Sequence, residues 1–250
     1  MRFIKELSKK TLLFIIPWIL GQAQAAVPST LQSDTIKIAC IGNSITAGAR
    51  TEHPESESYP AVLETLLHNT GFANYKVKNF GIGGATIIKY GSPNLWQQLK
   101  GLEDYKPDIV IIKAGTNETV GKPRYNWEHI VDYERDYVDY INHIKEINPH
   151  CQIIVCSPLD FALKTMGLTT ERLHDLKIRR PRIWELRERV RAIAKLQHYY
   201  FLDLTKPFKG KTELITAGDG VHPNIKGYQY LAKLVFSFLV HQQLIIKASK

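Results

Sequence analysis

Five short apolar runs rich in β-branched residues alternate along this chain with longer segments of helical periodicity. The runs occupy residues 35–41, 75–80, 108–114, 152–157 and 199–204, and several are apolar at nearly every position. Such a strand is covered on both faces, as in a parallel sheet. Helical spacing of apolar residues marks 59–69, 93–105, 126–147, 182–197 and 225–244. This alternation predicts an α/β fold, a three-layer α/β/α sandwich built on a parallel sheet.

The first 25 residues have the pattern of a secretory signal peptide. "MRFIKELSKK" is cationic, "TLLFIIPWIL" is a short apolar run, and Ala23-Gln24-Ala25 matches the small-residue pattern before a cleavage site. The apolar run is much shorter than the roughly 20 residues of a membrane-spanning helix. We therefore expect residues 1–25 to be removed, residues 26–250 to form one domain, and the mature protein to be periplasmic or secreted, without a membrane span.

The formal net charge of +9 does not indicate a nucleic-acid partner. Most basic residues are interspersed with acidic ones along predicted helices, which is typical of a solvated surface. The densest basic cluster is Lys177, Arg179, Arg180 and Arg182. No alternation of basic and aromatic residues and no nucleic-acid motif accompanies it, so we expect no DNA or RNA binding.

The three cysteines, Cys40, Cys151 and Cys156, indicate buried thiols rather than a metal or redox site. None belongs to a C-x-x-C pair. Cys151 and Cys156 flank one predicted strand, whose length of about 16 Å is too great for a disulfide. We therefore expect all three to act as small buried apolar side chains.

Small and polar residues follow the ends of the first three predicted strands. They are "GNSITAG" (42–48), "GIGGAT" (81–86) and "GTNE" (115–118). The carboxyl ends of parallel strands meet at one edge of a sheet, which is where ligands bind in such folds. A fourth island, "DGVHPN" (219–224), precedes the last helix and can fold over the same edge. The sequence thus predicts that these four islands of sequence lie together at one edge of the sheet.

These islands hold the residue types of nucleophilic catalysis. Ser44 is a candidate nucleophile, and Asp219 and His222 are spaced so that a carboxylate can hold an imidazole. The Asn117 amide and the Gly84 backbone N–H are candidate donors to an oxyanion. Each island alone also fits a turn or a helix cap. "GNSIT" is not a G-x-S-x-G elbow, and "GIGGAT" has Thr86 where a dinucleotide fingerprint needs glycine.

Together the four islands resemble the serine, glycine, asparagine and histidine blocks of the SGNH (GDSL-like) hydrolase superfamily. The resemblance covers nearly all of residues 35–240. It implies a flavodoxin-like, five-stranded parallel sheet and a serine esterase that needs no metal or other cofactor. It also implies a catalytic triad of Ser44, His222 and Asp219, with Ser44, Gly84 and Asn117 forming the oxyanion hole. Asn43 and Glu118 stand where aspartates are common, which puts the local geometry and the subfamily in question rather than the triad.

Further details resemble exported bacterial sialate O-acetylesterases and polysaccharide acetyl esterases. They are "ESYP" (57–60), Trp127 after "GTNE", and "DGVHPN". This implies a small-molecule or polysaccharide ester as substrate, with acetyl as the acyl group. Trp127 is a candidate stacking platform, or else a core anchor. Arg179, Arg180 and Arg182 are candidates to bind a sugar carboxylate, or else part of a solvated face.

Two other functions stay open on the sequence. A lysophospholipase or thioesterase could use the same scaffold, and a catalytically silent glycan-binding protein is the alternative outside enzymes. The segment 159–181 is the least regular long stretch and could form a cleft wall or a surface ornament.

Overall fold

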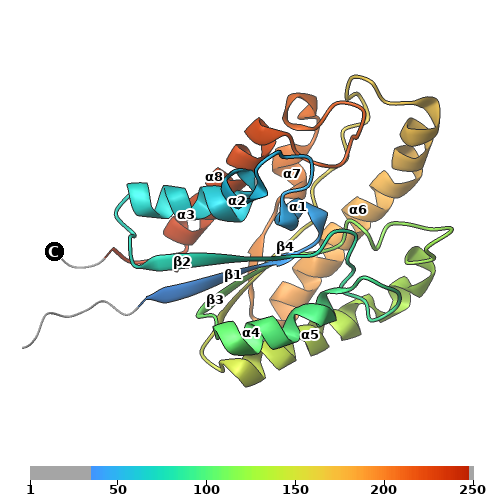
Figure 1. Ribbon diagram of the computed structural model, residues 1–250. Coiled ribbons are helices and arrows are strands. Elements are labelled where there is room, and N and C mark those ends of the chain that lie inside the picture. The colour runs from blue at the N-terminus through green and yellow to red at the C-terminus, as the bar shows by residue number, and fades with distance from the viewer. Residues whose placement is uncertain (1–34, 248–250) are drawn as a thin grey trace, which may run out of the picture. The chain divides into compact units, whose positions relative to one another are not determined.

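The computed structural model describes residues 35–247, which form a five-stranded parallel sheet (Figure 1). The strand order is β2-β1-β3-β4-β5. The strands are β1 (Ile36–Gly42), β2 (Tyr75–Gly81), β3 (Ile109–Lys113), β4 (Gln152–Cys156) and β5 (Tyr200–Leu202). The predicted α/β architecture is therefore confirmed, with each strand near its expected position. The predicted signal peptide, residues 1–25, lies outside the described residues.

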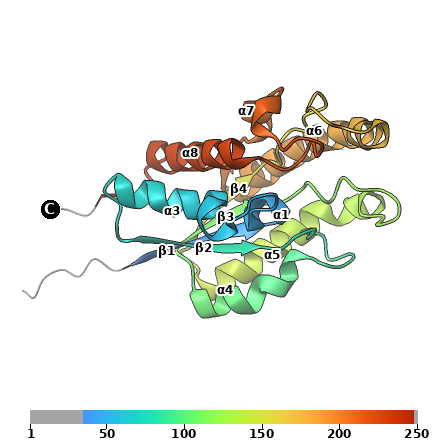
Figure 2. The same cartoon turned by 45° about the horizontal axis from the view of Figure 1, so that its top comes forward.

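Helices cover both faces of the sheet and give the three layers seen in Figures 1 and 2. One face packs against α3 (Tyr59–Asn69) and α8 (Ile225–His241), and the other against α4 (Leu99–Tyr105) and α5 (Tyr133–Ile147). Shorter elements connect them: α1 (Ser44–Ala47), α2 (Pro54–Glu57), α7 (Thr205–Phe208), η1 (Leu95–Gln98), η2 (Trp127–Asp132) and η3 (Thr212–Leu214). Within residues 35–247, no helix combines the length and apolar character needed to cross a membrane.

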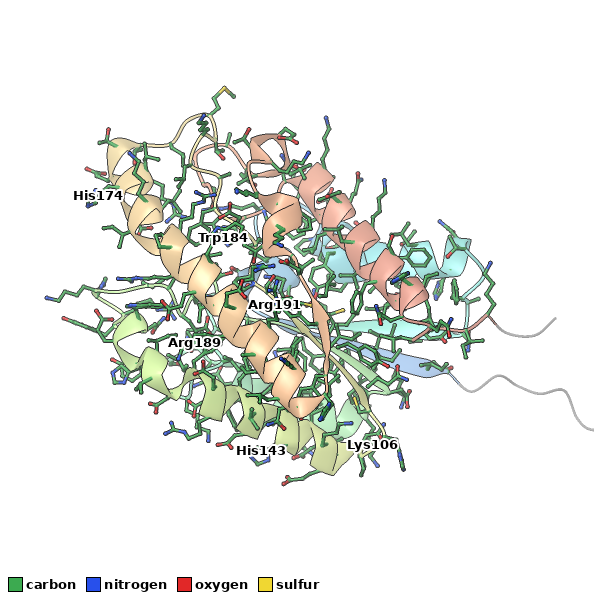
Figure 3. All side chains as sticks on the ribbon, turned by 180° about the vertical axis from the view of Figure 1, so that it is seen from behind. Lys106, His143, His174, Trp184, Arg189 and Arg191 are labelled. Atoms are coloured by element: carbon green, nitrogen blue, oxygen red, sulfur yellow. The ribbon has the colours of Figure 1, made fainter. Side chains whose placement is uncertain are left out.

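Helix α6 (Thr170–Gln197) begins well before residue 182, where the sequence pattern places its start. Figure 3 shows it from behind, running beside β5. Thr169 caps the helix by accepting a hydrogen bond from the backbone N–H of Arg172 at 3.1 Å. Pro181 lies inside the helix, where it removes one backbone hydrogen bond without ending the helix. The expectation of an irregular segment over 159–181 is therefore wrong for residues 170–181.

The strand register brings the carboxyl ends of four strands to one edge. Gly42 of β1 pairs with Gly81 of β2 and with Lys113 of β3, and Lys113 pairs with Cys156 of β4. Helix α1 packs directly on this edge because β1 and β2 both end in glycine. A Cβ on Gly81 would lie 2.2 Å from the backbone nitrogen of Ala47, a distance that atoms cannot reach without displacement.

The three cysteines are unpaired and buried, as the sequence predicts. Cys40 lies in β1, Cys156 lies in β4, and Cys151 directly precedes β4. Burial raises the pKa of the Cys40 and Cys151 thiols to about 12. These side chains fill the core and stay protonated at neutral pH.

Gly81→Ala should reduce the free energy of unfolding by about 2 kcal/mol, because its Cβ forces α1 away from the sheet. In a domain of this size that lowers the melting temperature by about 4–8 °C. Gly83→Ala is the matched control, since nothing lies within 4 Å of a Cβ at that position. Thermal and urea unfolding of both variants measure the difference, and equal stabilities would refute the close approach.

Candidate active site

The sequence places Ser44 at the carboxyl edge of the sheet by ending β1 and starting a helix within two residues. Gly42 ends β1, Asn43 caps α1, and Ser44 is its first residue. The buried Asn43 side chain accepts a hydrogen bond from the backbone N–H of Ile45 at 3.2 Å. Asn43 thus performs a capping role that a neutral amide fills as well as a carboxylate does. Gly48 closes the helix in the left-handed conformation, at φ +91°.

Asp219 and His222 lie on a turn that orients both side chains before any substrate binds. The Asp219 Oδ1 atom accepts hydrogen bonds from the backbone N–H groups of Val221 and His222, both at 2.9 Å. This is the local side-chain-to-backbone pattern that acidic residues favour in turns. The turn passes close to α6, since a Cβ on Gly220 would lie 2.4 Å from Leu176 Cδ1.

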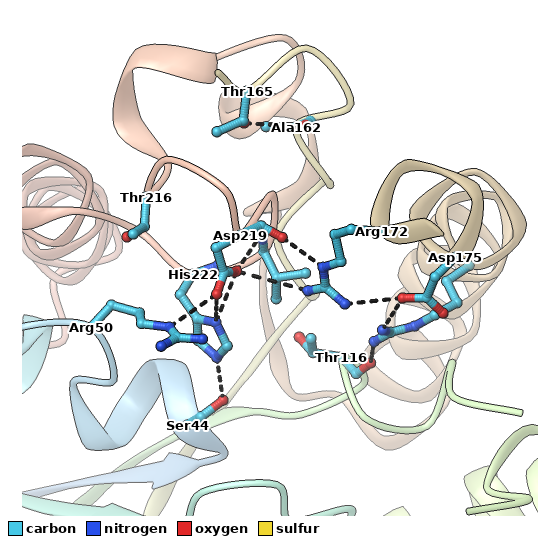
Figure 4. Close-up of polar contacts among 12 residues, drawn as sticks. Ser44, Arg50, Thr116, Ala162, Thr165, Arg172, Asp175, Thr216, Asp219 and His222 are labelled. Carbon is cyan, nitrogen blue, oxygen red and sulfur yellow. Dashed lines mark hydrogen bonds and ion pairs between the residues drawn. The ribbon is translucent and has the colours of Figure 1, made fainter. Parts of the chain in front are cut away.

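A continuous run of hydrogen bonds joins Ser44, His222 and Asp219 (Figure 4). The Ser44 Oγ atom lies 2.8 Å from His222 Nε2. The Nδ1 atom of His222 lies 3.0 Å from each carboxylate oxygen of Asp219. In this arrangement Nδ1 carries the proton and donates to the carboxylate, which leaves Nε2 free to accept the serine proton.

The Asp219 side chain is 6% exposed yet remains ionised. Burial alone would raise its pKa. Hydrogen bonds from the His222 ring and backbone and from the Val221 N–H outweigh burial, and hold the pKa of Asp219 well below its usual range. The carboxylate is therefore negatively charged at neutral pH.

Gly84 and Asn117 lie on two loops that contact one another beside the end of β1. The backbone N–H of Ile82 donates to the carbonyl of Gly42 at 2.9 Å, which ties the glycine loop to β1. Gly84 adopts φ +75°, a conformation that favours glycine. The Asn117 Nδ2 atom donates to the carbonyl of Ala85 at 2.8 Å. An amide nitrogen has two N–H donors, so Asn117 can hold this loop and still donate to a substrate oxygen.

Glu118 joins the same two loops through hydrogen bonds to their backbone. Its side chain is fully buried and accepts hydrogen bonds from the backbone N–H of Ile87 at 2.5 Å and of Gly115 at 3.0 Å. Burial raises the pKa of Glu118, while those N–H groups and the positive charge of the buried Lys113 act against the rise. Glu118 thus positions both loops by bonding to their backbone, and it does not reach the serine through any described contact.

The four candidate substrate-binding residues are engaged with the protein. The Arg179 guanidinium is buried and donates to Thr119 Oγ1 and to the carbonyl of Thr116. Arg180 forms a two-bond ion pair with Asp160, at 2.8 and 2.7 Å. Arg182 donates to the carbonyl of Thr119 and lies 4.8 Å from the centre of the half-buried Trp127 ring. These arginines attach α6 to the segments after β3 and β4 and do not form a solvated cluster.

Two arginines contact Asp219 that the sequence interpretation did not include. Arg50 Nε donates to Asp219 Oδ2 at 3.1 Å, and Arg172 Nε donates to the backbone carbonyl of Asp219 at 2.9 Å. Arg172 also pairs with Asp175, which in turn pairs with Arg179 (Figure 4). No motif in the sequence marks Arg50 or Arg172, because each meets Asp219 only through the tertiary fold.

Comparisons with known proteins identify a family and several relatives of this chain. The model of a family described as GDSL-like Lipase/Acylhydrolase matches residues 40–230. An acetylxylan esterase of Xylanibacter ruminicola is 26% identical over 235 residues, which are 86% of this chain and 45% of that protein. The chain thus spans less than half the length of that relative.

Solved structures confirm the fold. A lipase/acylhydrolase from Enterococcus faecalis has a TM-score of 0.67 at 21% identity, over 86% of this chain and 100% of that one. A carbohydrate acetylesterase from Sinorhizobium meliloti has a TM-score of 0.64 at 16% identity, over 83% and 99% of the two chains. At these identities the likeness concerns the fold alone.

Glu118→Ala should reduce the free energy of unfolding by at least about 2 kcal/mol, because it leaves two buried N–H groups unpaired and Lys113 without a nearby negative charge. The exposed Glu128 provides the control, and Glu128→Ala should change stability by less than about 0.5 kcal/mol. Denaturant unfolding measures both. Glu118→Ala with wild-type stability would show that the carboxylate does not hold the loops together.

Proposed function

Because the chain belongs to the GDSL-like lipase/acylhydrolase family, we propose that it is an exported serine esterase that removes acetyl groups from a carbohydrate. Family membership confirms the resemblance predicted from sequence and the enzyme class, a carboxylic ester hydrolase. The observation that carries the proposed mechanism is the hydrogen-bonded run from Ser44 through His222 to Asp219. The acetyl and carbohydrate parts rest on likeness to an acetylxylan esterase.

In the proposed first step, Ser44 Oγ attacks the carbonyl carbon of the ester. His222 Nε2, 2.8 Å away, accepts the serine proton as the new bond forms. The carboxylate of Asp219 stabilises the imidazolium and keeps the ring oriented through Nδ1. Proton transfer therefore needs no movement of either side chain from the geometry observed.

The carbonyl oxygen becomes an oxyanion in this step and needs fixed donors. The backbone N–H of Ser44, that of Gly84 and the second N–H of the Asn117 amide are the proposed donors. Ser44 begins α1, where a backbone N–H has no partner within its own helix. The hydrogen bonds from Ile87 and Gly115 to Glu118 support a fixed placement of the loops that carry Gly84 and Asn117 before substrate binds.

The imidazolium then gives its proton to the sugar oxygen as the bond between that oxygen and the acyl carbon breaks, and the acyl group stays on Ser44 Oγ. A water molecule then attacks the acyl carbon while His222 takes a proton from the water. The bond to Ser44 Oγ breaks, and the serine oxygen recovers the proton from His222. The products are acetate and the deacetylated sugar.

Export is proposed from the N-terminal sequence pattern, with residues 1–25 as signal peptide and 26–250 as one mature domain. Mass spectrometry of the protein collected outside the cytoplasm identifies its first residue. A mature chain that still begins at Met1 would contradict this part of the proposal without affecting the catalytic one.

Ser44→Ala and His222→Ala should each lower kcat by about 10³-fold or more, and Asn117→Ala by about 10²–10³-fold. The exposed Ser56 and His150 provide matched controls, and their alanine variants should keep wild-type rates. Hydrolysis of 4-nitrophenyl acetate with a thermal melt for each variant supplies the data. Full activity of folded Ser44→Ala would refute the serine mechanism, and full activity of Asn117→Ala would remove that side chain from the oxyanion hole.

Acyl length and sugar dependence distinguish the proposed substrate from its alternatives. The enzyme should hydrolyse 4-nitrophenyl acetate with a higher kcat/KM than the octanoate, and should release acetate from acetylated xylooligosaccharides in a Ser44-dependent manner. Preference for octanoyl or for a thioester would favour the lysophospholipase or thioesterase alternative. Glycan binding that is unchanged in Ser44→Ala, together with no acetate release, would identify a binding protein.

A further inference from the structure

The two oxygens of the Asp219 carboxylate share the His222 ring and differ in their other partners. Both lie 3.0 Å from His222 Nδ1. Oδ1 also accepts hydrogen bonds from the backbone N–H groups of Val221 and His222 within its own turn, and lies 3.9 Å from the Arg172 guanidinium. Oδ2 accepts a hydrogen bond from Arg50 Nε at 3.1 Å. Among the side chains of residues 35–247, only those of His222 and Arg50 hydrogen-bond to this carboxylate. Arg50 therefore provides the one contact that fixes Oδ2 from outside the turn.

The segment that carries Arg50 is held in a specific and unusual conformation. Arg50 has φ +74°, in the left-handed region that side chains other than glycine rarely adopt. The preceding carbonyl, of Ala49, accepts a hydrogen bond from the Tyr228 hydroxyl of α8 at 2.7 Å. The Thr51 hydroxyl donates to the Gly48 carbonyl at 2.7 Å. Contacts on both sides thus maintain a backbone conformation that directs Arg50 toward Asp219, although its side chain is 60% exposed.

We propose that Arg50 is a positioning residue of the catalytic triad, which holds the second oxygen of Asp219 in line with the imidazole. This inference rests on the proposed function, because it assigns Arg50 a role only if Asp219 orients His222 for catalysis. Figure 4 shows the Arg50 guanidinium beside the imidazole, on the side opposite to Arg172. Without Arg50, Oδ1 would still be held by its backbone partners beside Nδ1, but Oδ2 would be free to turn out of the plane of the imidazole.

The charge of Arg50 has a second effect, opposite in sign to its orienting role. A cation beside Asp219 offsets part of the negative charge that favours an imidazolium, so a neutral side chain in its place should favour the imidazolium. The other charged groups near the turn are Arg172, Asp175 and Arg179 on α6, and Glu52, Glu213 and Lys226 around the surface hollow that Arg50 lines. The Tyr228 hydroxyl of α8 bonds to the carbonyl of Ala49, next to Arg50. These stay in place when Arg50 is replaced, so its own contribution can be isolated.

Arg50→Gln should lower kcat on 4-nitrophenyl acetate about tenfold, because a misaligned general base reacts more slowly, and should leave KM nearly unchanged. The acid limb of its kcat/KM profile should move to higher pH by about half a unit, the size expected for an exposed charge. Arg50→Lys keeps the charge but not the Nε geometry, so it should restore the acid limb without restoring kcat. If Arg50 only stabilised the fold, Arg50→Lys would not restore the acid limb while leaving kcat low.

Lys226→Gln is the matched control. Lys226 lines the same surface hollow as Arg50, is exposed, and makes no described contact with Asp219. Its replacement removes one positive charge nearby and should change neither kcat nor the acid limb. In an Asp219→Asn background, Arg50→Gln should have no further effect on kcat, because its target is already lost.

Chemical rescue tests whether the guanidinium group of Arg50 itself supports catalysis. Guanidinium chloride at low millimolar concentration should recover part of the kcat of Arg50→Ala, whereas sodium chloride at equal ionic strength should not. Wild-type kcat and pH profile in Arg50→Gln would overturn the proposal. So would a rise in KM confined to anionic esters, which would make Arg50 a substrate-binding residue. Full activity of Ser44→Ala would instead refute the proposed function, so the two failures are distinguishable.

Discussion

The close approach of α1 to the sheet edge is the constraint on which the candidate site depends. Gly42 and Gly81 end adjacent strands in register, and the absence of side chains at both lets the helix that begins at Ser44 lie against them. The same register aligns Lys113 with Gly42, so the loop carrying Asn117 leaves the sheet beside the serine. Parallel pairing thus converts distant sequence positions into neighbours, and backbone contacts rather than long side chains set their spacing.

Most of the fold and the core of the site could be predicted because they depend on local patterns. Strand runs and helical periodicity located all five strands, and α3 was predicted at its observed bounds. Ser44, Asp219 and His222 stood out because each lies where a strand ends or a helix begins, and the structure brings them within hydrogen-bonding distance. Their catalytic roles, and those of Gly84 and Asn117, remain proposals.

The sequence could not predict features that arise from tertiary contacts. Pro181 disfavours a helix locally, yet α6 passes through it, and the side chains of Arg179 and Arg182 on either side attach the helix to the loop after β3. A basic cluster in sequence thus becomes a set of separate internal contacts, because successive positions on a helix face different neighbours. Arg50 was missed for a related reason, since its partner Asp219 lies far along the chain.

The three buried thiols have a consequence for how the chain reaches its native state. In the folded protein, burial raises the pKa of the Cys40 and Cys151 thiols to about 12, so oxidants find almost no thiolate to attack at neutral pH. The unfolded chain has no such protection, and a disulfide between Cys40 and either of the others would join β1 to residues in or next to β4 and block the insertion of β3 between them. Sensitivity of the three thiols to oxidation is therefore confined to the interval before the sheet closes around them.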